Sequence, residues 1–454
     1  MISPYLIWSL NKFIIYVTFF IFCLVSNLVL GANDKLVNLQ FTRVVEQALQ
    51  NDYDLKIAEQ DIKISKAQHN EIRAELWPKL YLRAYSDYTS DLTTDQAEVV
   101  VIGDQVFGDE SKFQTATTLK LNYLIFDSGL WNDKQNFYEK EILKQKLNKQ
   151  IIAQQLKIQI LELYKNIWLN FEALSTQKKL LVYKQESADF YQRLYKAGKI
   201  SKLKVADAKI DLKNSTLETM YLKEKLKDQL QELAIYTGEN YHTSQILVQG
   251  FTDISADSTK LLNRPDIPLE ITQRVDYKKM ETEIAKKRLE LEMLQKGNKL
   301  KINLEGEYLY YAADYTSLRR AWANFLPKTW VIRMTATYPL FQGFAESAQA
   351  EKIKMETKKW QLKKEKLFWE TKLFYQTLVN KIAQNKKTLQ HNQKKYLELS
   401  KKAYMLARLK KYKLIEKVNL WEQKMGIEQM LLEQKKLIIK TQADLLKYFL
   451  FLEG

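Results

Sequence analysis

The chain has 454 residues with only 12 glycines and 6 prolines, and no proline occurs between Pro78 and Pro265 or after Pro339. Such stretches, dominated by Lys, Leu, Glu, Gln and Ala, are typical of long helices and exclude a series of ordinary globular domains. The formal net charge of +17 is spread along them. It therefore indicates solvated helix faces and excludes a clustered nucleic-acid-binding loop.

The N-terminal segment has the layout of a secretory signal. Lys12 precedes an apolar run without charge over 13–30, and Gly31-Ala32 follow it. We predict a signal peptide over residues 1–32, because small residues end the run and no basic cluster follows. An uncleaved membrane anchor is the alternative, since 18 apolar residues approach the minimum that spans a bilayer. Cys23 is the only cysteine and lies in this run, so the mature chain has no thiol.

The first half of the chain alternates between helical and strand periodicity. The pattern predicts a helix over 41–76, a strand over 80–87, an acidic loop over 89–114 and a second strand over 118–125. A helix then extends from 129 to about 196. Ala197-Gly198 interrupts it, and another helix follows over 200–236. Long helices joined by a short loop predict an antiparallel hairpin.

The second half repeats this order. After a segment of mixed Gly, Pro, Ser and Thr, the pattern predicts a helix that follows Arg274–Tyr277, a strand over 300–310, a loop over 312–329 and a strand over 330–338. Helices over 343–411 and 414–452 complete the series. Phe126 and Ile200 are 74 positions apart, as are Phe341 and Ile415. We therefore predict an internal duplication, with repeats over 33–238 and 269–454 and a connector over 239–268.

The strands indicate a membrane protein of a particular kind. Each predicted strand is apolar on one side, and four strands are too few for a closed barrel in one chain. Open sheet edges in lipid would leave backbone groups unpaired, so closure requires further copies. The fold class is therefore mainly α with β: one sector of an outer-membrane β-barrel, continuing into helical hairpins that form a periplasmic α-barrel. The alternative is a periplasmic or surface coiled-coil scaffold or adhesin whose strands form no pore.

Particular motifs resemble those of the TolC-like outer membrane efflux protein family over essentially the whole mature chain. The matching segments are Ala48–Asp52, Leu76–Pro78, Phe126–Gly129, Ala197–Ser201 and Tyr338–Gly343. The resemblance implies a homotrimer with a 12-stranded barrel in outer-membrane lipid of a Gram-negative bacterium. It also implies a periplasmic tunnel that docks to an inner-membrane transporter through a periplasmic adaptor. The function expected is a passive exit duct for an efflux pump or a type I secretion system. The sequence names neither the pump class nor the substrate.

The resemblance also implies the site residues. The family closes its periplasmic end with acids near the second hairpin tip, where this chain has Lys413, Asn419 and Glu422. At the first tip Gly198, Lys204 and Asp207 stand in the matching positions. We hypothesise that three copies of Lys204 and Glu422 pair at this aperture. The strand-to-helix turns are expected at Phe126, Asp127 and Gly129 in the first repeat and at Pro339, Phe341 and Gly343 in the second.

Catalytic patterns are missing from the sequence. His69, His242 and His391 stand apart from one another, with no partner at the helical spacing of a metal site. There is no glycine-rich phosphate loop and no nucleophile elbow. We therefore expect no enzyme activity, no cofactor, no resident metal and no nucleic-acid partner.

Overall fold

The computed structural model describes residues 37–88, 100–102, 105–107, 113–243, 246–251, 271–314, 316–323, 326–411 and 417–452. The predicted signal peptide, 1–32, and most of the predicted connector lie outside these residues. The described chain divides into two compact units. The first, here the hairpin unit, contains residues of 37–52, 155–251 and 377–451; the second, the sheet unit, contains residues of 53–154 and 271–376.

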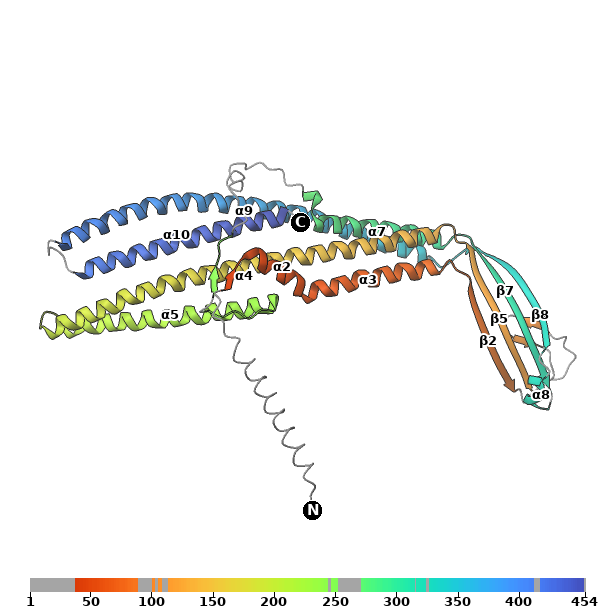
Figure 1. Ribbon diagram of the computed structural model, residues 1–454. Helices are drawn as coiled ribbons and strands as arrows, with labels where there is room; N and C mark the ends of the chain where they lie inside the picture. The colour runs from red at the N-terminus through yellow and green to blue at the C-terminus, as the bar shows by residue number, and fades with distance from the viewer. Residues whose placement is uncertain are drawn as a thin grey trace, which may run out of the picture. The chain divides into compact units, whose positions relative to one another are not determined.

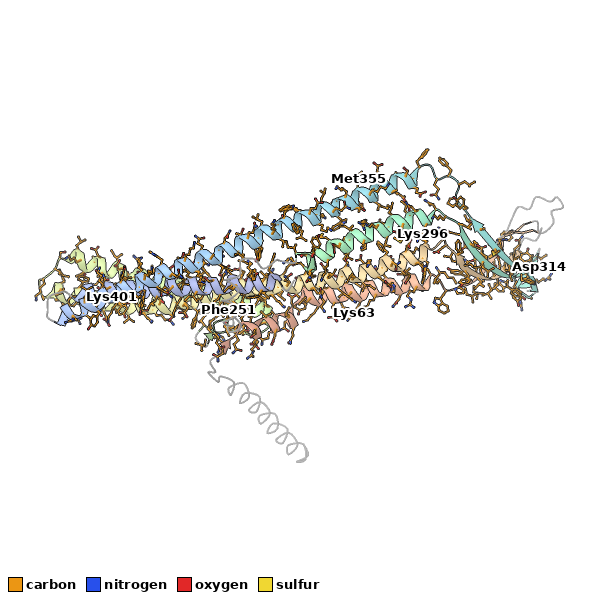
Figure 2. All side chains as sticks on the ribbon, turned by 90° about the horizontal axis from the view of Figure 1, so that it is seen from above. Lys63, Phe251, Lys296, Asp314, Met355 and Lys401 are labelled. Atoms are coloured by element: carbon orange, nitrogen blue, oxygen red, sulfur yellow. The ribbon has the colours of Figure 1, made fainter. Side chains whose placement is uncertain are left out.

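The sheet unit is built on four antiparallel strands. β2 (Lys79–Tyr88), β5 (Phe113–Phe126), β7 (Lys301–Asp314) and β8 (Leu326–Thr337) lie side by side in that order (Figure 1). They extend from the helix ends near Lys296 to a far end at Asp314, as Figure 2 shows. At the far end the short helix α8 (Leu318–Ala323) packs against β5 and β7.

The helices of the sheet unit follow the order of the strands to which they connect. α3 (Tyr53–Ala74) precedes β2, α4 (Leu130–Lys196) follows β5, α7 (Val275–Gly297) precedes β7 and α9 (Ala345–Lys411) follows β8. Ion pairs link neighbouring members of this series. Lys134 of α4 pairs with Glu75, the residue directly after α3, Lys296 of α7 with Asp133 of α4, and Lys287 of α7 with Glu356 of α9. The strand order is thus continued in a layer of helices, with α3 and α9 outermost.

The hairpin unit contains two antiparallel helical pairs. α4 returns as α5 (Lys202–Thr237), and α9 returns as α10 (Lys417–Leu452) (Figure 1). Every boundary of α9 and α10 lies 215 positions after the corresponding boundary of α4 and α5. The duplication itself stays a prediction, which would account for this constant offset.

A small parallel sheet was missed by the sequence patterns. β1 (Val37–Leu39) pairs with β6 (Ile246–Val248), which falls within the predicted connector. The Tyr164 hydroxyl lies 2.7 Å from the carbonyl oxygens of both Leu39 and Gln249, and burial raises the pKa of this phenol. The rings of Phe41 and Phe251 contact the Tyr164 ring, and Trp168 packs edge to face on Phe251. Three-residue strands are too short for periodicity to reveal, so packing decides them.

Two further predictions need correction. The helix predicted over 41–76 is interrupted at Asp52, which is extended (ψ 128°) and separates α2 (Phe41–Asn51) from α3. Asn51 and Asp52 favour turns over helix interiors, and the Asn51 amide donates to the Thr237 carbonyl at 2.6 Å.

The predicted loops over 89–114 and 312–329 contain regular structure. The first includes a hairpin of β3 (Val100–Ile102) and β4 (Gln105–Phe107). The second includes α8 and the start of β8, where Pro327 hides the strand pattern. A proline is tolerated there because β8 is an edge strand of its sheet and a register shift occurs opposite, between Leu309 and Tyr310.

Candidate functional site

The four-stranded sheet has one continuous apolar face. In adjacent cross-strand rows, Leu80, Leu121, Gly306 and Ile332 stand in register, as do Leu82, Leu119, Tyr308 and Trp330. The apolar side chains on the outer strands of these rows are uncovered: Leu82 is 74% exposed, Trp330 69% and Ile332 68%. Exposed apolar surface that runs across a whole sheet marks a contact with lipid or another protein.

The opposite face of the same rows is polar. Tyr81, Lys120 and Glu307 stand in register there. In the next row Arg333 on β8 lies 3.6 Å from Glu305 on β7. The sheet thus carries charged side chains on one face and none in the apolar rows of the other face. Strands that separate lipid from an aqueous interior have this arrangement.

The first predicted strand-to-helix turn is held by Asp127. Its carboxylate accepts hydrogen bonds from the backbone N–H groups of Gly129, at 3.0 Å, and Trp131, at 2.6 Å. These are among the N–H groups that have no partner within a helix, so Asp127 caps α4. Ser128 and Gly129 have positive φ, and the Ser128 hydroxyl donates to the Leu300 carbonyl.

The second turn has the same backbone with different side chains. Gly343 and Phe344, 215 positions after Ser128 and Gly129, also have positive φ. Leu340, Phe341 and Phe344 are exposed, and the rings of Phe341 and Phe344 meet edge to face at 5.5 Å. They line an open cavity together with Tyr338, Pro339 and other residues of the turn. The predicted turn residues of both repeats therefore lie at these turns.

The capping role of Asp127 makes a prediction. Asp127→Ala is expected to destabilise the sheet unit by about 1 kcal/mol, because two N–H groups lose their acceptor. Gln342→Ala, at the corresponding position of the second turn, is the matched control and is expected to have little effect. Thermal unfolding in detergent measures both, and equal destabilisation by the two variants would contradict the capping role.

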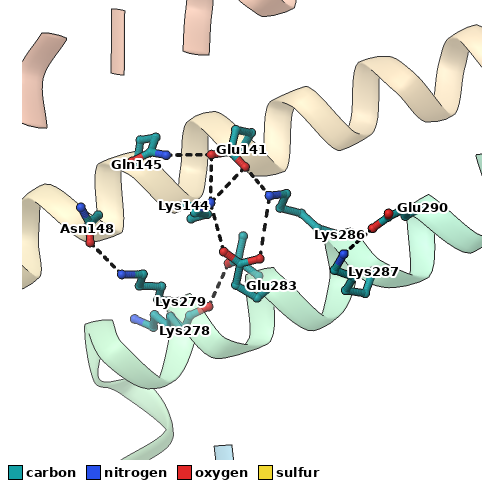
Figure 3. Close-up of polar contacts among 11 residues, drawn as sticks. Glu141, Lys144, Gln145, Asn148, Lys278, Lys279, Glu283, Lys286, Lys287 and Glu290 are labelled. Carbon is teal, nitrogen blue, oxygen red and sulfur yellow. Dashed lines mark hydrogen bonds and ion pairs between the residues drawn. The ribbon is translucent and has the colours of Figure 1, made fainter. Parts of the chain in front are cut away.

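Four charged side chains, two of them buried and two partly buried, join α4 to α7 in the sheet unit (Figure 3). Lys144 lies 3.1 Å from Glu141 and 3.2 Å from Glu283, and Lys286 pairs with the same two carboxylates. Glu283 and Lys286 are 91% buried and Glu141 is 85% buried. Since every charge has partners of opposite sign, the cluster supports the helix layer rather than a reaction.

The electrostatics of this cluster follow from burial and pairing. Burial raises the pKa of Glu141, but hydrogen bonds from Lys286, Gln145 and Lys144 outweigh it and lower the pKa below its usual value. Burial lowers the pKa of Lys144, and its contacts with Glu141 and Glu283 outweigh this and raise it. Both groups are thus held charged over the neutral range.

The predicted tip residues meet at a cavity in the hairpin unit. This cavity of about 320 Å³ lies between α4, α5 and α10, and its lining includes Lys204, Asp207 and Glu422. Lys184 and Asp211 form an ion pair of 2.8 Å in the same lining. Trp421 is 4% exposed and packs edge to face on Phe190. A single chain therefore brings three of the predicted aperture residues together.

The remaining residues predicted at the hairpin tips are Gly198, Lys413 and Asn419. Gly198 ends the first helix of its hairpin with φ 68°, and its N–H donates to the Tyr195 carbonyl. Lys413 lies outside the described residues. Asn419 is within α10, but its side chain is outside them.

Sequence reasoning missed Trp421 and the Lys184–Asp211 pair. The pair had a signal: Lys184 stands 14 residues before Gly198 and Asp211 stands 13 after it, so a hairpin centred there brings them level. No sequence signal pointed to Trp421, because its burial depends on the packing of α10 against α4. Among the described residues, no cluster of His, Cys, Asp and Glu is arranged to hold a metal ion. In the same part of the chain, every helix is too short or too polar to cross a bilayer.

Comparisons with known proteins agree with this geometry. The family model described as outer membrane efflux protein matches residues 44–239. No curated protein matches the sequence. Among solved structures, the chain is similar to the outer membrane protein VceC from Vibrio cholerae, with 14% identity, a TM-score of 0.71, and coverage of 91% of this chain and 94% of that one.

Two further structures are similar to a comparable degree. The CmeC outer membrane channel of Campylobacter jejuni has 15% identity and a TM-score of 0.71, covering 90% of this chain and 85% of that one. The open state of the MtrE outer membrane channel of Neisseria gonorrhoeae has 14% identity and a TM-score of 0.70, covering 91% and 89%. The resemblance inferred from the sequence motifs is confirmed, and the mainly helical fold with strands is that of these channels.

Proposed function

We propose that this chain, similar to the outer membrane efflux proteins in sequence and fold, is one subunit of a homotrimeric outer-membrane export duct. The apolar rows of its sheet face outer-membrane lipid, and the polar rows face an aqueous interior. The duct is passive, and an inner-membrane transporter of an efflux pump or a type I secretion system supplies the energy through a periplasmic adaptor. The chain is thus a channel subunit and not an enzyme.

The observation that carries this proposal is the apolar face across all four strands. β2 and β8 each pair on one side only within the described sheet. In lipid such edges need partners, which copies of the same sheet supply. Three sheets of four strands then make the 12-stranded barrel. The scaffold or adhesin reading provides no role for uncovered Leu82, Trp330 and Ile332, and the fold of known channels does not favour it.

The two predicted repeats remain part of the proposal. Residues 33–238 form the first repeat and residues 269–454 the second, and residues 239–268 connect them. The constant offset of 215 positions supports this division. The pairing of β6 with β1 adds that part of the connector is built into the hairpin unit.

The proposal assigns the periplasmic aperture to the hairpin ends. Lys204, Asp207 and Glu422 contribute mixed charge there in each copy, so the trimer carries three lysines beside six carboxylates at this level. Rings of charged side chains control which ions pass a pore. The hypothesised pairing of Lys204 with Glu422 is available within one chain, because both line the same cavity.

The function is tested by single-channel conductance in planar bilayers, with the oligomeric mass of the detergent-extracted protein measured in parallel. The expected result is a trimer with small, stable conductance steps from a constricted end. A monomer that does not conduct would overturn the proposal and leave the scaffold reading.

Charge reversal at Lys204 tests the aperture itself. Lys204→Glu is expected to raise cation over anion permeability by about fivefold, the effect of about 1 kcal/mol of electrostatic energy. The reversal potential in a salt gradient measures it. Lys209→Glu, on the same helix but outside the cavity lining, is the matched control. Equal selectivity in the Lys204 variant and the parent protein would refute the assignment.

A further inference from the structure

The polar face of the four-stranded sheet carries more basic than acidic side chains. Because side chains alternate along a strand, the register shows which of them share this face. From the helix end of the sheet to the row of Leu309, its basic residues are Lys79, Arg83, Lys120, Lys301 and Arg333, here named the basic ladder. Over the same described length, the face holds two carboxylates, those of Glu305 and Glu307. Five basic groups against two acids leave an excess of three positive charges in each chain.

The excess charge is spread along the strands. In order from the helix end, the charged members of the rows are Lys301; then Lys79, Glu305 and Arg333; then Lys120 and Glu307; and then Arg83. Each of these described rows is neutral or positive. Lys301 and Leu309, which shares the row of Arg83, are eight residues apart on β7. Since a strand rises about 3.3 Å per residue, the basic ladder extends over roughly 26 Å.

The basic ladder ends where the same face becomes apolar. Toward the far end of the sheet a buried apolar cluster follows, which comprises Ala116, Leu309 and Tyr311. Asp87 stands beyond this cluster, in register with Gln114, and so is separated from the ladder. In the ladder itself, Lys79, Arg83 and Arg333 are exposed. Their positive charge is therefore accessible to a solute on the polar side of the sheet.

We propose that the barrel interior is a transit site for small polyanionic solutes, which carry several carboxylate or phosphate groups. Three copies of an excess of three place nine positive charges around one aqueous space. Such a space between low-dielectric walls concentrates ions of the opposite sign. Lysine and arginine also donate charge-assisted hydrogen bonds to carboxylates and phosphates. The inference rests on the proposed export duct and names the class of substrate that the duct carries.

The distribution of the charges suits passage better than retention. A conducted solute must bind well enough to enter and weakly enough to leave, which several sites in series allow. Glu305 lies 3.6 Å from Arg333, and Glu307 stands in register with Lys120. These acids moderate the attraction at two levels of the basic ladder. Neighbouring rows are roughly 7 Å apart along a strand, so a polyanion reaches the next level before it leaves the previous one.

The aperture proposed at the hairpin ends has the opposite balance of charge. Its cavity lining holds two lysines against three acids, an excess of one negative charge per chain: Lys184 and Lys204, and Asp207, Asp211 and Glu422. A polyanion that the transporter has moved past the aperture is attracted by the barrel and repelled from the way back. The charges at the two levels of the duct therefore favour outward passage of anions.

Channel block measures the attraction of the barrel for anions. Citrate, added to the barrel side of trimers in planar bilayers, is expected to reduce the conductance reversibly. The half-blocking concentration should rise about tenfold between roughly 0.1 M and 1 M KCl, because the screening length falls from about 10 Å to about 3 Å. Spermine, a polycation, is expected to block at least about tenfold less well from the same side.

Two variants of one ion pair test the ladder with opposite signs. Arg333→Gln is expected to raise the half-blocking citrate concentration about fivefold, and Glu305→Gln is expected to lower it about fivefold. A merely structural role of the Arg333–Glu305 pair would shift both variants in the same direction. Lys209→Gln, which removes an exposed positive charge from α5, is the matched control and is expected to leave the block unchanged.

The outcomes separate this inference from the proposed function. Conducting trimers that citrate does not block, or that spermine blocks better, would overturn the inference and leave the export duct standing. A shift of both variants in the same direction would also overturn it. A monomeric, non-conducting parent protein would overturn the proposed duct and this inference together.

Discussion

Ile332→Arg is expected to destabilise the membrane-inserted protein by about 2–4 kcal/mol, the cost of a basic side chain on the lipid face of a barrel near the midplane. Ile332 is 68% exposed and stands in a row with Leu80 and Leu121, so no neighbour in the sheet shields the substituted charge. Urea titration of the protein in lipid vesicles measures the loss, and a lower yield of assembled trimer in the outer membrane accompanies it.

Val331→Arg is the matched control for this variant. Val331 is adjacent in the same strand but points to the polar face, where Arg333 already pairs with Glu305. Its replacement is expected to change stability by less than about 1 kcal/mol. If the two variants behave alike, the sheet does not separate lipid from water. In a soluble scaffold, Ile332→Arg would be close to neutral, as for exposed surface substitutions generally.

Glu141→Gln is expected to lower the free energy of unfolding by about 2–3 kcal/mol, somewhat less than the 3–5 kcal/mol for breaking a fully buried ion pair. Its removal leaves Lys286, 91% buried, with Glu283 as its remaining ion-pair partner at 3.8 Å. Lys144 also loses a carboxylate and keeps only Glu283. Loss of helical circular dichroism with temperature or denaturant in detergent measures this change.

The pH dependence of this effect has a defined sign. The folded-state pKa of Glu141 is below its ordinary value of 4.5, so its stabilisation is fully present above that value and is lost as pH falls through the lowered pKa. The pKa of Lys144 is raised, so its contribution is present below its ordinary value of 10.5 and is lost as pH rises through the raised pKa. The difference between parent and variant should therefore be constant from about pH 5 to 10 and shrink in acid.

Glu59→Gln is the matched control. Glu59 pairs with Lys149 of α4 at 3.3 Å, but it is 52% exposed, and exposed pairs contribute less than about 1 kcal/mol. If Glu59→Gln lowered the free energy of unfolding as much as Glu141→Gln, burial would not determine the strength of these ion pairs. A pH-independent loss at Glu141 would mean that charge is not its basis.

The sequence by itself determined the long helices, the four main strands, the two strand-to-helix turns and their repetition. These features depend on local rules: alternation makes Leu119, Leu121 and Tyr123 share a face, and Asp127 caps the helix that it precedes. The same rules located the hairpin break at Gly198. The resemblance to outer membrane efflux proteins could also be found in the sequence, because the motifs that carry it are short and contiguous.

Only the tertiary structure decided which residues meet across long sequence separations. Periodicity cannot say that Trp421 lies on Phe190, that Glu141 pairs with Lys286, or that three-residue β1 and β6 form a parallel pair around Tyr164. Each contact arises because two helices or strands pack, and packing depends on partners far away in the chain. Local preferences specify an element and its faces, whereas burial and charge pairing specify which faces come together.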